Sequence, residues 1–349
     1  MSTGIDPTFT VGAYLVTETE ATGYTVAKPF IVTLPFTNDP GSACAYERTV
    51  SPKNQIVSVT KTVVDSEAVL GSDIDYTISA SIPAEPMTSL SIEDELAIEL
   101  GQATNVLVHT EYATTSADIT LVELADYTLA NNGPGGVATD NDLSIILTPT
   151  GLSKLNDLRV NNPNLKLIVN FNTRVIVLPA NGTIRNDAIV RYPNSTVTTT
   201  PTDPDNPIDD NGVETRLGTL TVNKVDSDEV LIADGTATFE LWRCALNSDN
   251  RWAVSGTGPI NVFTEASVMN VSTEADLDAY ALSNPPVSSF ETVAGQATLY
   301  GIRAFNFANG VATAGTSDIC LVETVAPDGY PYVSGLSGTT MTQHIRLIT

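Results

Sequence analysis

Alternation of apolar and polar residues with a period of two constrains the fold of this chain more than any other feature. Clear examples are found at residues 56–63, 74–80, 166–171 and 220–225. Each segment is rich in β-branched residues, so each is expected to form a strand with one buried face. Helical signals are confined to residues 150–155 and 272–277, where Ser272 or Thr273 is expected to cap a short helix. The sequence therefore predicts an all-β sandwich fold with small helical insertions.

The length of the chain indicates more than one domain. A chain of 349 residues is longer than one ordinary sandwich requires, so two or three hydrophobic cores are expected. Residues 198–212 lack apolar periodicity and are rich in turn-forming residues, as is typical of a linker. A second boundary is expected near Pro52, before the strand that holds Lys61. We therefore predict a partial N-terminal block at 1–57, a middle sandwich at 58–218 and a last sandwich at 219–349.

One motif recurs in the first and last blocks. Residues 15–24 and 320–330 each contain an apolar strand, then Glu-Thr-x-Ala, then Gly-Tyr. We infer that the two blocks contain related domains. The first block has room for only the last few strands of such a domain, so we expect either that the domain is truncated or that its strands pair with another segment.

The charge of the chain excludes several classes of partner. The sequence has 41 acidic and 16 basic side chains, for a net charge of -25, which repels nucleic acids and anionic membranes. The hydrophobic content of 42% is ordinary for folded domains, so the acidic residues are expected on solvated surfaces. No apolar run is long enough to span a bilayer. Any secretion signal is expected to have been removed or to lie outside this sequence, because the first residues lack a basic and an apolar region.

Three cysteines occur, Cys44 near the start and the pair Cys244 and Cys320 in the last block. In an acidic, lysine-poor and strand-rich chain, such a pair indicates one disulfide and an oxidising exterior, with Cys44 as a buried or leftover thiol. The pattern also allows two buried free thiols.

Lys61 is unusual because it lies on the strand face where the alternation requires an apolar residue. A buried ammonium is unfavourable unless it is paired or neutralised. Asp94, and Asn186 in an expected strand at 183–190, are also polar residues on core-facing strands of the middle block. The three residues are either a surface lysine with two unrelated polar groups, or the parts of an intramolecular transamidation.

An apolar site would promote that transamidation. It lowers the pKa of a lysine and raises the pKa of an aspartic acid, so both groups become neutral. Lys61 Nζ would then attack Asn186 Cγ while Asp94 transfers a proton, and ammonia would leave. The reaction would occur once per chain, so it consumes no substrate, and the chain is not expected to be an enzyme or to need a metal or another cofactor.

Four segments of the middle block follow one family's order and spacing. They are Lys61-Thr62-Val63, Tyr76-Thr77-Ile78-Ser79-Ala80-Ser81-Ile82-Pro83, Ile92-Glu93-Asp94-Glu95-Leu96 and Asn186-Asp187-Ala188-Ile189-Val190. Through them the sequence resembles the major pilins of Gram-positive bacteria, particularly the corynebacterial and actinomycete type. The resemblance implies tandem immunoglobulin-like domains of the collagen-adhesin type, and a cell-wall-anchored, extracellular pilus assembled by a class C-type sortase. It also implies that Lys61 and Asn186 are the bonded pair and that Asp94 is the catalytic acid.

The last block resembles the family's collagen-adhesin B-type domain. This resemblance implies that Lys224 is a nucleophile, that Glu323 is a catalytic acid, and that Cys244 and Cys320 form a disulfide. The family places the acceptor asparagine on the final strand, but no asparagine follows Glu323 in this sequence. We expect either that the acceptor lies beyond the sequence or that the bond is lost, in which case Lys224 and Glu323 form a buried ion pair.

Lys53 corresponds by resemblance to the lysine of the family's pilin motif, Tyr-Pro-Lys-Asn. The sequence here is Ser51-Pro52-Lys53-Asn54, so serine replaces the usual tyrosine. In the family this lysine attacks the acyl-enzyme that sortase forms on the next subunit, and Lys53 is therefore expected to be exposed. An ordinary surface lysine is the alternative. The Leu-Pro-x-Thr-Gly sorting signal is absent from the sequence and is expected to follow Thr349.

Other functions have weaker support. His109 and His344 are far apart and have no partner in a recognisable motif, so no hydrolase triad is predicted. The aspartates between 203 and 210 are more typical of an acidic linker than of a calcium loop. A tip or accessory pilin is one alternative, and it would not need Lys53. A carbohydrate- or matrix-binding module is another; it would need an exposed aromatic platform, whereas only 6% of the residues are aromatic. The expected partners are neighbouring pilin subunits, the sortase and a host surface ligand.

Overall fold

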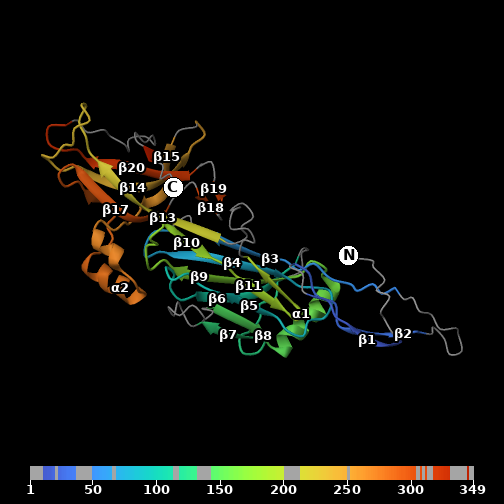
Figure 1. Cartoon of the computed structure of the whole chain (residues 1–349). Coiled ribbons are helices and arrows are strands. Elements are labelled where there is room, and N and C mark those ends of the chain that lie inside the picture. Colours follow the sequence, from blue (N-terminus) through green and yellow to red (C-terminus); the bar gives the residue numbers. More distant parts are fainter. Residues whose placement is uncertain are drawn as a thin grey trace.

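The computed structural model in Figure 1 shows three groups of strands that follow one another along the chain. It describes residues 11–19, 23–36, 49–64, 68–112, 118–131, 143–199, 213–249, 252–303, 307–308, 311–312, 317–330 and 344–345. The N-terminal group is a two-stranded ribbon in which β1 (Gly12–Val16) pairs antiparallel with β2 (Phe30–Leu34). Val11, Leu15 and Ile31 of this ribbon region are largely exposed, so the ribbon has no buried core of its own among the described residues.

The middle group is a sandwich of two antiparallel sheets. Ile78 and Phe171 of one sheet and Ile92 and Ile145 of the other belong to a single buried core. In its first sheet the order is β3 (Val59–Val64), β4 (Asp73–Ser81), β9 (Lys166–Arg174) and β6 (Thr104–Glu111). In its second sheet the order is β12 (Ser195–Thr198), β11 (Ile189–Tyr192), β5 (Ser91–Asp94), β8 (Leu143–Leu147) and β7 (Tyr127–Asn131). Helix α1 (Pro149–Asn161) follows β8 and buries Leu152 and Leu155.

The last group has a second core, formed by residues such as Leu241, Leu299 and Leu321. One of its sheets has the order β10 (Thr183–Asn186), β13 (Val213–Asn223) and β17 (Gln296–Arg303). The other has the order β15 (Trp252–Pro259), β14 (Thr238–Leu246), β20 (Ser317–Val325) and β21 (His344–Ile345), with β16 (Phe290–Glu291) also on β14. The remaining elements are a 3-10 helix η2 (Ala266–Asn270), helix α2 (Glu274–Ser283) and the short hairpin β18 (Phe307–Ala308) and β19 (Val311–Ala312).

The predicted fold class is confirmed: the chain is mostly β, with antiparallel sheets and short helices. The alternation of buried and exposed residues in β3 and β4 follows the predicted period of two. The two expected helices are α1 and α2, and Thr273 is the residue that caps α2, accepting a hydrogen bond from the backbone N–H of Asp276 at 3.1 Å.

The prediction of one continuous strand at 183–190 is wrong. The segment forms β10 and β11, which lie in different sheets. Between them, Ala188 leaves the first sheet and its backbone exchanges hydrogen bonds with Thr199. The chain therefore passes from one sheet to another at Asp187 and Ala188.

Strand β13 connects the middle and last groups. Its residues 213–216 pair with β10, and its residues 217–223 pair with β17. A second contact joins the groups nearby, where the backbone N–H of Leu70 donates to the carbonyl of Gly301 at 3.0 Å. Gly301 has φ of +74°, and a Cβ there would lie 2.6 Å from Leu70 Cβ.

Gly301→Ala should therefore weaken the chain at this junction. Alanine would have to adopt a left-handed conformation and would also collide with Leu70, so we expect a loss of about 2 kcal/mol or more in the free energy of unfolding. Urea denaturation followed by tryptophan fluorescence would measure the loss. Gly258→Ala is the matched control, because a Cβ at Gly258 has no heavy atom within 4 Å. Equal midpoints for the two variants would contradict the prediction.

Candidate functional site

Lys61 lies on β3 with its side chain inside the middle sandwich. The residue is 4% exposed, and its neighbours on the same strand face, Val59 and Val63, are also buried. The alternation of β3 thus places an amine on the core face, as the sequence indicated.

The Lys61 amine has two polar contacts and two aromatic ones. Nζ forms an ion pair with the Asp94 carboxyl at the end of β5. It also donates a hydrogen bond to the backbone carbonyl of Asp187, at 3.0 Å. The ring centroids of Tyr76 and Phe171 lie 4.9 and 5.8 Å from Nζ. These four groups fix the amine between the two sheets.

Burial moves both ionisable groups toward their neutral forms. Removal from water lowers the pKa of Lys61, and the nearby Asp94 carboxylate opposes this effect only in part. Removal from water likewise raises the pKa of Asp94, against the opposing effect of Lys61. Both shifts favour the neutral forms, and the neutral form of an amine is the nucleophilic one.

Asn186 completes the group of three residues. It is the last residue of β10, is 1% exposed, and contacts Asp94 closely enough to influence the pKa of that carboxyl. By geometric criteria, neither amide atom of Asn186 has a hydrogen-bond partner among the described residues. An unsatisfied buried amide is costly, and its presence beside a buried amine and acid is a reason to assign it a chemical role.

The change of sheet after Asn186 explains how the three residues meet. Because β10 and β11 belong to different sheets, the backbone turns at Asp187 and directs its carbonyl to Lys61 Nζ. No pattern in the sequence indicated this carbonyl contact. The Tyr76 and Phe171 rings were also missed, although their alternation on β4 and β9 places both on the core face.

Lys224 and Glu323 form a second lysine–carboxylate pair, in the last domain. Nζ and Oε1 are 2.7 Å apart, and the side chains are 18% and 7% exposed. Lys224 follows β13 directly, and Glu323 lies on β20. The sequence predicted this ion pair for the case that the bond is lost, but a lysine–carboxylate pair is present in both domains, so the pair does not distinguish that case from an acceptor that lies beyond the sequence.

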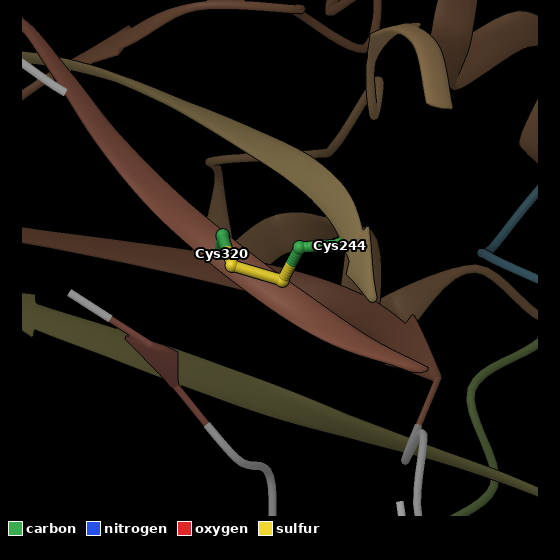
Figure 2. The surroundings of a disulfide bond; sticks show 2 residues. All are labelled: Cys244 and Cys320. Carbon is green, nitrogen blue, oxygen red and sulfur yellow. A yellow bond between two sulfur atoms is a disulfide. The ribbon is translucent and has the colours of Figure 1, made fainter. Parts of the chain in front are cut away.

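The predicted disulfide between Cys244 and Cys320 is present (Figure 2). It joins the adjacent strands β14 and β20, where Cys320 pairs with Trp242 and Cys244 pairs with Asp318. Both cysteines are fully buried. The bond therefore connects neighbouring strands of one sheet, and it closes a chain segment that includes α2 and β17.

Lys53 is exposed and lies beside a groove of about 420 Å³. Residues 25–30 of the N-terminal block form one part of the groove, and residues 83–88 and 193–194 of the middle sandwich form the rest. Four prolines line it, which gives a rigid wall of low polarity: Pro52, Pro83, Pro86 and Pro193. Lys28 is a second exposed amine in the same groove.

The other candidate residues do not come together. His109 bonds to Asn170 on the neighbouring strand at 2.9 Å, a structural contact. Cys44 and the aspartates at 203–210 lie outside the described residues. Within the described part of the chain, no three His, Cys, Asp or Glu side chains converge as metal ligands. No helix there is long and apolar enough to cross a membrane.

Comparison of the sequence with known proteins gives two fimbrial relatives. The chain is 28% identical to fimbrial subunit type 1 of Actinomyces viscosus over 352 residues, which cover 92% of this chain and 60% of that protein. It is 31% identical to fimbrial subunit type 2 of Actinomyces naeslundii over 238 residues, or 63% of this chain and 41% of that protein. The chain thus spans roughly half the length of these relatives. No protein-family model matches it.

Solved structures give the same result. The full-length major pilin SpaD of Corynebacterium diphtheriae matches with a TM-score of 0.62 and 28% identity, over 92% of this chain and 70% of that one. The fimbrial protein FimP of an oral Actinomyces species matches with a TM-score of 0.62 and 24% identity, over 97% of this chain and 74% of that one, which supports the fold. This chain is therefore similar, in sequence and in fold, to the major pilins of Actinomyces and Corynebacterium, which are structural proteins rather than enzymes.

Proposed function

We propose, on the premise of this similarity, that the chain is a backbone subunit of a covalently polymerised pilus on a Gram-positive cell surface. A pilus shaft carries load and needs durable domains more than it needs a substrate site. The pattern of features agrees with that requirement: sandwich domains in sequence, a disulfide in the last of them, and a buried amine, acid and amide in the middle one. Adhesion to a host surface is part of the same proposal, as a property of the assembled fibre.

The observation that carries the proposal is the arrangement of Lys61, Asp94 and Asn186. We propose that Lys61 Nζ attacks Asn186 Cγ, so that a new C–N bond forms while the bond from Cγ to the amide nitrogen breaks. The proton lost from Nζ passes through Asp94 to the departing nitrogen, which leaves as ammonia. Burial supplies a neutral amine and a protonated acid, and the fold holds the three groups in place. The product is an internal isopeptide bond.

Lys53 is proposed as the amine that joins subunits. Its exposure beside a groove leaves Nζ accessible to a second protein, unlike the amine of Lys61. A sortase of class C type would hold the C-terminal end of the next subunit as an acyl-enzyme, and Lys53 Nζ would attack that acyl group. The three successive blocks 1–57, 58–218 and 219–349 would then repeat along the fibre.

The role of Lys53 can be tested with the chain itself. Incubation with a class C-type sortase and a donor peptide containing Leu-Pro-x-Thr-Gly should attach one peptide, cut after threonine, to Lys53. Lys53→Ala should abolish this product because it removes the nucleophile, and peptide-mapping mass spectrometry would locate the attachment. Lys28→Ala is the matched control, since Lys28 is exposed in the same groove. Attachment that persists in Lys53→Ala would refute the assignment.

A further inference from the structure

Helix α2 belongs to the last domain by sequence but packs in the core of the middle domain. Four residues of the segment that contains it are buried in the same cluster as the middle sandwich, namely Phe263, Val268, Val271 and Leu277. Tyr280 is partly buried against that cluster, and its ring lies 5.8 Å from that of Phe263. The last domain has a separate core, to which none of these residues belongs. The apolar side of this insertion is therefore covered by the neighbouring domain.

The contacts of α2 fall on three segments of the middle domain. Leu277 lies over the turn at Gly71, where a Cβ would be 4.0 Å from Leu277 Cδ2 and where φ of +90° requires glycine. Glu274 lies over Gly101. Arg174, at the end of β9, forms ion pairs with Asp278 at 2.6 Å and with Glu274 at 3.7 Å. The sequence has only 16 basic side chains, and Arg174 is one of them. Its partners lie on α2, which has acidic residues in its first turn.

These three segments are also bonded to one another. Arg174 Nε donates to the carbonyl of Gly71 at 3.0 Å, and the N–H of Gly101 donates to the carbonyl of Arg174 at 2.8 Å. Helix α2 thus packs on one end of the middle sandwich, where these three segments are already joined by hydrogen bonds. Figure 1 shows α2 beside that end of the sandwich, near β9 and β6. On the same side of the molecule the two domains share β13 and the backbone contact between Leu70 and Gly301.

We infer that residues 263–281 act as a clamp between the two domains. This segment of the last domain completes the core of the middle domain, so that the two domains unfold locally as one cooperative unit. A flexible joint would require a small, polar interface, whereas this one contains a fully buried leucine, a charged pair and a shared strand. The inference depends neither on the isopeptide bond nor on polymerisation, since the contacts of α2 with Gly71, Gly101 and Arg174 include neither residue of that bond.

Hydrogen–deuterium exchange of the full chain, read by mass spectrometry, tests the clamp. Leu277→Ala leaves a cavity between the domains, so exchange should become at least about tenfold faster both in α2 and in the middle-domain turn at residues 68–72. The two segments are far apart in sequence, so a common change would show that the contact between the domains protects both of them. Leu282→Ala is the matched control, because Leu282 lies on the same helix but is 87% exposed. It should change neither segment.

Asp278→Ala provides a second, milder variant for the case that Leu277→Ala does not fold. The Asp278 side chain is 59% exposed, so its loss removes the ion pair with Arg174 without opening a cavity. We expect exchange about two- to threefold faster in both segments. Faster exchange in α2 alone, with residues 68–72 unchanged in both variants, would overturn the inference.

Discussion

Lys61→Ala should be lighter than its sequence only by the two hydrogens that the Cys244–Cys320 disulfide removes, whereas the parent chain should be lighter by one ammonia in addition. The difference is about 17 Da for each amide nitrogen displaced by the lysine amine, and intact-protein mass spectrometry resolves it. Asn186→Ala should abolish the deficit as well, because it removes the acceptor. Lys224→Ala should retain it, since Lys224 has a carboxylate partner in the last domain and takes no part in the middle-domain bond.

The same variant should be strongly destabilised. Without Lys61, the buried Asp94 carboxyl loses its partner, and removal of one member of a buried pair costs about 3–5 kcal/mol. The proposed crosslink between Lys61 on β3 and Asn186 on β10 is lost in addition. Asn186→Ala keeps the ion pair and should be destabilised less, so thermal unfolding of the two variants separates the two contributions. A folded parent chain that has not lost ammonia would refute the bond and leave only the ion pair.

Removal of the disulfide should have the next largest effect. Replacement of Cys244 and Cys320 by serine, or reduction of the parent, should lower the stability of the last domain by about 2–5 kcal/mol, because the bond closes a long loop in the unfolded chain. The cysteines are 76 residues apart, which places the expected loss toward the upper part of that range. Denaturant unfolding with and without reductant would measure it.

The control for this prediction is the middle domain. Its Lys61–Asp94 pair lies in a different core, so the loss of one ammonia should still be found by intact-protein mass spectrometry when the disulfide is absent. Identical midpoints for the parent with and without reductant, despite complete loss of the bond, would show that the sheet contacts between β14 and β20 suffice alone.

Much of the fold could be predicted because most strands are half-buried and amphipathic. In β3 the alternation is strict, so the exception at Lys61 was visible without any structure. Asp94 and Asn186 were found by the same reasoning combined with a family resemblance. The amine, the acid and the amide were thus identified as candidates from the sequence, whereas the Tyr76 and Phe171 rings beside the amine were not.

The change of sheet at residues 187–188 could not be predicted, for a specific reason. Ile184, Asn186, Ala188 and Val190 are all buried, so the period of two continues without interruption through the change. Alternation records which side of a strand is covered, not which strand lies beside it. The Asp187 carbonyl contact was invisible for that reason.

The position of α2 is a second feature beyond the sequence. Only Leu277 is buried among its ten residues, so no apolar stripe indicates which surface it covers. Its partner surface is assembled from residues near 71, 101 and 174, which are brought together by the middle sandwich alone. Such a contact is set by tertiary structure and leaves no local pattern.

The shared strand β13 has a practical consequence for anyone who wishes to study the domains apart. A fragment beginning at residue 219 would omit the four residues that pair with β10. A fragment ending at residue 218 would keep that pairing, but its last two residues, Leu217 and Gly218, would lack their partners on β17. Either cut exposes unpaired backbone groups at a sheet edge, which favour aggregation. Fragments that overlap across the whole of β13 avoid this, and the smallest piece expected to behave well in solution spans both sandwiches.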